Sequence, residues 1–128
     1  MLLERRRTDR DRRQDSRVSA VFAVRNLIGT RIHFGQAEDI APTGITLLRP
    51  RDVAVLPETP LSLLFDLPGG SARVSVRGVV ISDRRSGPFR RTGVQFTDIS
   101  PENAALLADY CTRRNHQTGA RGLAMNPR

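Results

Sequence analysis

The chain has 128 residues, 38% of them hydrophobic and 27% charged, which is typical of one globular domain and excludes a largely disordered chain. Its formal net charge is +8, and all 21 basic residues are arginine, whose planar donor fork suits phosphates, carboxylates and guanine edges. No apolar run approaches the roughly 20 residues that span a membrane, and no apolar leader follows Met1. We therefore expect a cytoplasmic protein with an anionic partner and no membrane insertion.

The chain begins with a charged segment, and six predicted strands follow it. Residues 1–17 hold seven arginines and four acidic residues, and residues 1–11, which lack apolar periodicity, are expected to form a flexible basic arm. Alternating or β-branched runs between turn signals predict strands at 18–24, 30–38, 45–48, 60–70, 72–82 and 92–98. Short strands joined by turns rather than by helices favour an all-β antiparallel barrel or sandwich.

One helix is predicted at the C-terminal side of the strands. Ser100 is a suitable N-cap, and Pro101 suits the first helical position. An apolar stripe that could cover the open end of a barrel is formed by Ala104, Leu107, Ala108 and Cys111. We place the end of the domain at Arg114 and expect residues 115–128 to form a disordered tail.

The sequence offers little with which to build an enzyme. His33 and His116 lie in a strand and in the tail, with no cluster of metal ligands near them, and no catalytic or phosphate-loop motif is present. The single cysteine, Cys111, excludes an intramolecular disulfide and a cysteine-rich zinc site, and its place on the helical stripe favours a buried structural thiol. We therefore expect no catalytic residues, no metal and no cofactor.

Two short segments have the chemistry of a ligand site. In "RRQDSR", Arg13 and Arg17 are four residues apart, with Arg12 beside them, so they could close on a phosphate or a guanine edge. In "DIAPTG", Asp39 could accept hydrogen bonds from the N1–H and N2–H of a guanine, and Gly44 could adopt positive φ or let a ligand approach closely. Taken separately, the first segment is better explained as a solvated charge run, and the second is weak evidence because Asp39 and Gly44 could simply form a turn.

With these two segments in this order, the sequence resembles the PilZ domain family. An R-x-x-x-R lies just before the first strand, D-x-x-x-x-G lies between the second and third, and "VRGVVIS", "TGVQFTDIS" and a helix follow, so the resemblance covers residues 12–114. It implies a six-stranded antiparallel β-barrel that binds cyclic di-GMP. By position, Arg13 and Arg17 would be the paired arginines and Arg12 the preceding one, with Asp39 and Gly44 in the second motif.

The chain departs from the family motif at one position. Ala41 stands where the family has serine, and a lost hydrogen bond costs about 0.5–1.5 kcal/mol, roughly a three- to twelvefold loss in affinity. The leading hypothesis is a cyclic di-GMP receptor that signals to a partner protein when the ligand orders its N-terminal arginines on the barrel. Arg12 adds the hypothesis that two stacked ligands bind.

Two alternatives come from other functional classes. A degenerate PilZ adaptor would bind only a protein partner, and Ala41 motivates this hypothesis. Nonspecific nucleic-acid binding would follow from the charge of +8, but aromatic residues make up only 5% of the chain and leave few stacking platforms. A further set of arginines flanks "SGPF" and is expected mostly to face solvent: Arg84, Arg85, Arg90 and Arg91.

Overall fold

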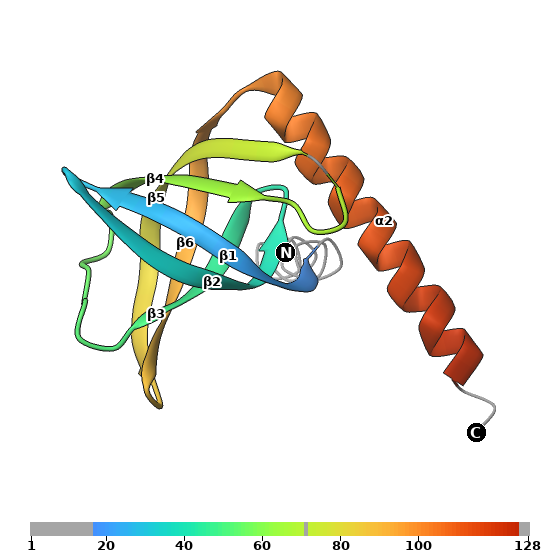
Figure 1. The fold of residues 1–128 in the computed structure, drawn as a ribbon, viewed down its shortest axis with the longest axis horizontal. Coiled ribbons are helices and arrows are strands. Elements are labelled where there is room, and N and C mark those ends of the chain that lie inside the picture. Colours follow the sequence, from blue (N-terminus) through green and yellow to red (C-terminus); the bar gives the residue numbers. More distant parts are fainter. Residues whose placement is uncertain (1–16, 71, 126–128) are drawn as a thin grey trace, which may run out of the picture.

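The structure is a computed structural model that describes residues 17–70 and 72–125, with side chains described up to residue 115 (Figure 1). The predicted arm at residues 1–11 and the two arginines Arg12 and Arg13 lie outside the described residues. The elements are, in chain order, β1 (Val18–Ile28), β2 (Arg31–Ala41), β3 (Gly44–Pro50), β4 (Pro60–Asp66), β5 (Arg73–Ser86), β6 (Phe89–Ile99) and α2 (Pro101–Met125).

The six strands close into a barrel in the order β1-β2-β3-β6-β5-β4, and every neighbouring pair is antiparallel. The predicted six-stranded antiparallel barrel with one C-terminal helix is therefore confirmed. Several strands run further than the apolar patterns indicated. One example is β5, which continues past its predicted end at 82 to Ser86 because its polar end stays paired with the start of β6 across the turn at Gly87.

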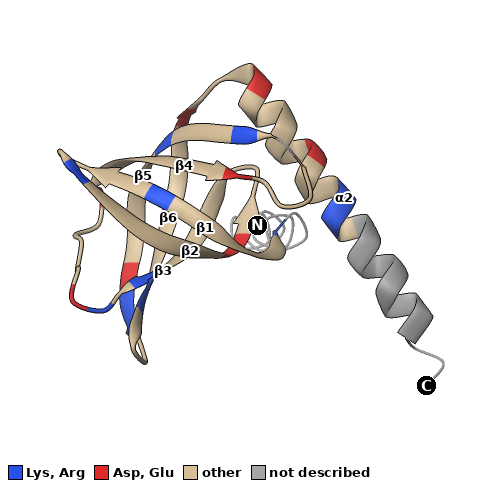
Figure 2. Ribbon diagram, in the orientation of Figure 1, with Lys and Arg blue, Asp and Glu red and all other residues tan. Residues whose placement is uncertain are grey.

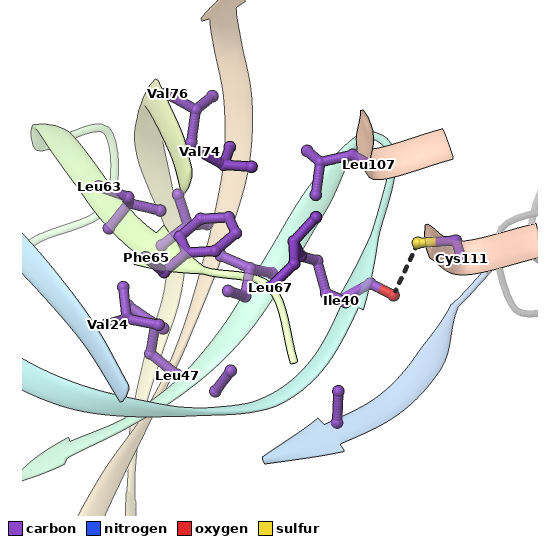
Figure 3. Close-up of a cluster of buried hydrophobic side chains, with 14 of the residues drawn as sticks. Val24, Ile40, Leu47, Leu63, Phe65, Leu67, Val74, Val76, Leu107 and Cys111 are labelled. Atoms are coloured by element: carbon purple, nitrogen blue, oxygen red, sulfur yellow. Dashed lines mark hydrogen bonds between the residues drawn. The ribbon is translucent and has the colours of Figure 1, made fainter. Parts of the chain in front are cut away.

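Alternation along the strands fills the barrel with aliphatic side chains. In β4 and just after it, Leu61, Leu63, Phe65 and Leu67 are all buried, as their spacing predicts. They pack against Val24, Leu47, Val74 and Val76 from the other strands (Figure 3). Gly78 lies at an irregularity in the pairing of β5 with β6, which agrees with the bulge expected there.

Helix α2 covers one end of this barrel. Ser100 caps it, since its Oγ accepts a hydrogen bond from the Asn103 N–H at 3.1 Å. Leu107 and Cys111 are buried against the core, and the Cys111 Sγ lies 3.8 Å from the Ile40 carbonyl oxygen (Figure 3). Burial raises the pKa of this thiol to about 11, as suits a structural cysteine.

Two expectations for the helix were wrong. Ala108 is exposed, because it lies about 100° around the helix axis from Leu107, and the buried face is completed instead by Tyr110. The helix also continues to Met125 rather than ending at Arg114, since no proline interrupts the chain before Pro127. No helix among the described residues has the length and apolar character needed to cross a membrane.

The opposite end of the barrel is closed by polar side chains. Arg49, Asp83 and Thr92 are buried there, and Arg90 is largely buried beside them. Asp83 contacts the other three residues: it accepts hydrogen bonds from Thr92 Oγ1 at 2.7 Å and from Arg90 Nε at 2.7 Å, and its Oδ1 lies 3.9 Å from Arg49 Nη1. We call these four residues the buried ionic network.

Candidate ligand-binding site

The candidate site forms where the start of β1 crosses β2 and β3. Arg17, just before β1, donates from Nη1 to Asp39 Oδ1 at 3.0 Å and to Thr46 Oγ1 at 3.1 Å. Along the chain, Asp39 lies 22 positions and Thr46 lies 29 positions after Arg17. The barrel therefore brings a residue of each sequence motif into direct contact.

Strand pairing fixes this arrangement. The two-residue turn at Pro42 and Thr43 sets Ala41 opposite Gly44, and two pairs further along the register Asp39 lies opposite Thr46. On its other side β2 pairs with β1, where Asp39 faces Ser19. Because side chains alternate along a strand, Ile40 enters the core while Asp39 and Thr46 lie on the outer face of the sheet, where Thr46 is largely covered, with 9% of its surface exposed.

The contact between Arg17 and Asp39 remains open to exchange. The Arg17 side chain is 40% exposed and that of Asp39 is 23% exposed. An ion pair this accessible contributes at most about 1 kcal/mol, so a ligand can replace it at low cost. Among the described residues Nε and Nη2 of Arg17 have no partner, which leaves further donors for an anion.

No side chain projects from the β6 position beside Thr46, because its pairing partner there is Gly93. A Cβ at Gly93 would lie 2.6 Å from Ser82 Oγ, so a larger residue here would require the Ser82 side chain to move. The exposed Ile81 lies next to it. The site thus combines a carboxylate acceptor, guanidinium donors and a hydroxyl group with a shallow apolar neighbour, which suits a ligand that has both anionic groups and flat rings.

Comparison with known proteins places this barrel. The PilZ domain family matches residues 11–113. The chain belongs to the PilZ domain family. A comparison with curated proteins found no match to it.

Several solved structures are similar to this PilZ domain at low sequence identity. The Bacillus subtilis inhibitor of motility MotI/DgrA has a TM-score of 0.73 at 19% identity, over 79% of this chain and 50% of that one. The PilZ domain of YcgR from Escherichia coli, solved with c-di-GMP, gives 0.66 at 13%, over 83% and 93%. PlzA from Borreliella burgdorferi, in complex with c-di-GMP, gives 0.56 at 13%, over 91% and 58%. The chain thus spans only about half of MotI and of PlzA, and these similarities establish the fold.

The structure also changes how the second motif of this PilZ domain is understood. Gly44 does not have positive φ, and the expectation of that conformation was wrong. A Cβ at this position would lie 2.5 Å from the Val94 carbonyl oxygen, so glycine is required because β6 passes so close. Ala41, opposite Gly44, is buried, which leaves its methyl group almost closed to solvent.

Thr46 was missed in the sequence. Its signal was the two-residue turn, from which the register and hence the partner of Asp39 follow by counting. Arg12 and Arg13 remain predicted ligand residues. Among the described residues, no three His, Cys, Asp or Glu side chains gather as metal ligands would.

Proposed function

We propose that this PilZ domain is a receptor for cyclic di-GMP and binds it at the surface around Arg17 and Asp39. The observation that carries the proposal is the contact between these two residues, which come from separate motifs and meet at 3.0 Å on the outside of the barrel. Membership of the PilZ domain family supports it. The relatives YcgR and PlzA, whose structures contain c-di-GMP, support it further.

The proposed roles follow from the donors and acceptors of each group. Asp39 accepts the N1–H and N2–H of a guanine once its bond to Arg17 opens. Arg17 then turns its guanidinium to a phosphate or to the O6/N7 edge of a guanine, and Arg12 and Arg13 neutralise the remaining phosphate charge. Thr46 donates its hydroxyl to the ligand or keeps its hydrogen bond with Arg17.

Ligand binding reaches the rest of the molecule in two ways. It fixes the segment that carries Arg12 and Arg13 against the barrel, which changes the surface offered to a protein partner. It also acts next to α2, because Arg114 donates from Nη2 to the Ser19 carbonyl oxygen at 2.9 Å, and Ser19 is paired with Asp39. A shift of β1 at Ser19 would therefore change the hydrogen bond that connects β1 to Arg114 of the helix.

The test is isothermal titration calorimetry with cyclic di-GMP at physiological salt, with GTP as the control anion. We expect selective, saturable binding, which Arg17→Ala weakens at least roughly tenfold because charge-assisted hydrogen bonds are lost. Arg13→Ala has the same expected effect. The matched control is Arg73→Ala, which breaks an ion pair of the same 3.0 Å length with Asp66 on strands β4 and β5. Unchanged affinity in a folded Arg17→Ala protein would contradict the assignment.

The same titration decides two narrower questions. Saturation at two ligands per chain supports the role of Arg12 in holding a stacked pair, and saturation at one rejects it. The adaptor alternative, motivated by Ala41, predicts no heat from the folded protein. In that case Ala41→Ser tests whether the missing hydroxyl alone abolished binding.

A further inference from the structure

Two arginines on the outside of the barrel belong neither to the candidate site nor to the buried ionic network. Arginines gather where β5 and β6 run towards their hairpin (Figure 2). Among them, Arg84 of β5 and Arg91 of β6 are directly opposite each other in the register, and both are exposed. Their neighbours Asp83 and Thr92 point inward to the network, so alternation along the strands turns Arg84 and Arg91 outward.

The face that carries these two arginines also carries the candidate site. Thr46 of β3 is paired with Gly93 of β6, and two residues further along both strands Leu48 is paired with Arg91. Residues two apart on a strand point to the same side and lie about 7 Å apart. Arg91 therefore belongs to the row next to that of Thr46, and Arg84 continues this row onto β5.

An ion pair connects this row to the residue next to Asp39. Arg91 reaches from β6 across β3 to β2, where its Nη2 donates to Glu38 Oε2 at 2.7 Å. The pairing of β2 with β3 is irregular at this point, and Glu38 and Asp39 are both partly exposed while the residues on either side of them are buried. Two consecutive carboxylates thus each bind an arginine from another element, Asp39 binding Arg17 and Glu38 binding Arg91.

Positive charge is in excess in this row, and a ligand can reach it. The Arg91 side chain is 52% exposed and that of Glu38 is 35% exposed, and an ion pair this accessible contributes little, so an anion can replace Glu38 at low cost. Arg84 has no carboxylate partner among the described residues. Like charges in directly opposed positions destabilise a sheet, so an anion bound between Arg84 and Arg91 would relieve their repulsion.

We propose that Arg91 and Arg84 form a second anion subsite of this surface and bind the phosphate of cyclic di-GMP that lies farther from Arg17, an assignment that rests on the proposed function. The ligand has two phosphates on opposite sides of its ring, so arginines at two places on one face can each bind one. Arg91 leaves Glu38 and binds the phosphate through two N–H groups, and Arg84 adds its charge from β5. Gly93 has no side chain, which leaves the surface between the two subsites open to the ligand.

The test is calorimetric titration of the full chain and its variants with cyclic di-GMP at physiological salt. Arg91→Ala should weaken binding roughly tenfold, because charge-assisted hydrogen bonds are lost. Glu38→Gln breaks the same ion pair from its other side, but it should strengthen binding about threefold because it frees Arg91 and removes a negative charge. Arg84→Ala should weaken binding about threefold, since it removes one nearby charge. An ion pair with a purely structural role would give Arg91→Ala and Glu38→Gln effects of the same sign.

Matched controls remove the same charges elsewhere. Asp66 and Arg73 form an exposed ion pair between β4 and β5, and Asp66→Asn and Arg73→Ala, which break it from either side, should both leave the affinity unchanged. Arg77→Ala removes an exposed arginine from the earlier half of β5 and should also have no effect. If Arg77→Ala weakens binding as much as Arg91→Ala does, net charge explains the result and the second subsite is rejected.

The outcomes separate this subsite from the function on which it rests. Wild type that binds cyclic di-GMP, with affinity lowered by Arg17→Ala but unchanged by Arg91→Ala and Glu38→Gln, would overturn the second subsite and leave the proposed function intact. Wild type that is folded by circular dichroism but binds no cyclic di-GMP would overturn both. Weaker binding by Arg91→Ala together with tighter binding by Glu38→Gln is the result that supports the subsite.

Discussion

The two ends of the barrel are closed by different physical means. At one end α2 lays Leu107 and Cys111 on aliphatic side chains, so closure there is burial of apolar surface. At the other end the buried ionic network closes the barrel, with backbone groups of the loop after β3 as further partners. Removing atoms from an apolar contact lowers the free energy of unfolding in proportion to what is removed. Removing one partner of a buried ion pair costs more, because it leaves the other charge buried without a counter-ion.

Asp83 is the residue on which the polar end depends. Burial alone would raise its pKa, but hydrogen bonds from Thr92, the Val55 N–H and Arg90 outweigh that effect and leave the pKa lowered. Burial lowers the pKa of Arg49, and the charge of Asp83 opposes that lowering. One carboxylate thus serves as the counter-ion of both Arg49 and Arg90.

The largest expected effect is therefore at Asp83. Asp83→Ala leaves Arg49 and Arg90 buried without their counter-ion, which should lower the free energy of unfolding by about 3–5 kcal/mol. Urea denaturation followed by circular dichroism measures it. The control is Asp66→Ala, which breaks an exposed pair with Arg73 and should leave stability near wild type. Equal losses in the two variants would show that the network does not close the barrel.

The apolar end is tested at Leu107. Leu107→Ala should lower the free energy of unfolding by about 2–5 kcal/mol, towards the lower part of that range, because side chains at the margin of a core can move into the space. The neighbouring Leu106→Ala removes the same atoms from a partly exposed position and should cost much less. If both substitutions lower the free energy of unfolding equally in urea denaturation, the buried face of α2 does not stabilise the barrel specifically.

The difference between the ends also explains what the sequence could predict. Alternating apolar residues such as Leu61, Leu63 and Phe65 signal the barrel directly, because each inward position needs a side chain without charge. The polar end has no such signal. Arg49 and Arg90 belong to stretches that look like solvent-facing charge, and only the closed barrel brings them to Asp83.

The candidate site, too, could be predicted only in part from the sequence. Motif order pointed to Arg17 and Asp39, which do meet, whereas Thr46 required the strand register. The reason for glycine at position 44 could not be read locally, since it lies in the approach of Val94 from a strand 50 residues away in the sequence. Contacts across neighbouring strands decide these details, and a local pattern does not contain them.

The smallest expected effect is a dependence of stability on pH, which we expect at the polar end of the barrel and not at the apolar end. The folded-state pKa of Asp83 lies below its ordinary value of 3.8, so its ionised form is favoured by folding. Its contribution to stability is full above about pH 4 and is lost as the pH falls through the folded-state pKa. The stability difference between wild type and Asp83→Asn should therefore be constant above about pH 4 and shrink below it.

This loss is smaller than that of Asp83→Ala, because a protonated carboxyl group still fills its place and still accepts hydrogen bonds. The difference between wild type and Leu107→Ala should stay constant over the same pH range, since no titrating group is removed at the apolar end. Parallel pH profiles of all three proteins in urea would contradict the ionic closure of the far end. Convergence for Asp83→Asn alone would place the acid sensitivity of the barrel there, because at that end the carboxylate of Asp83 balances buried charge.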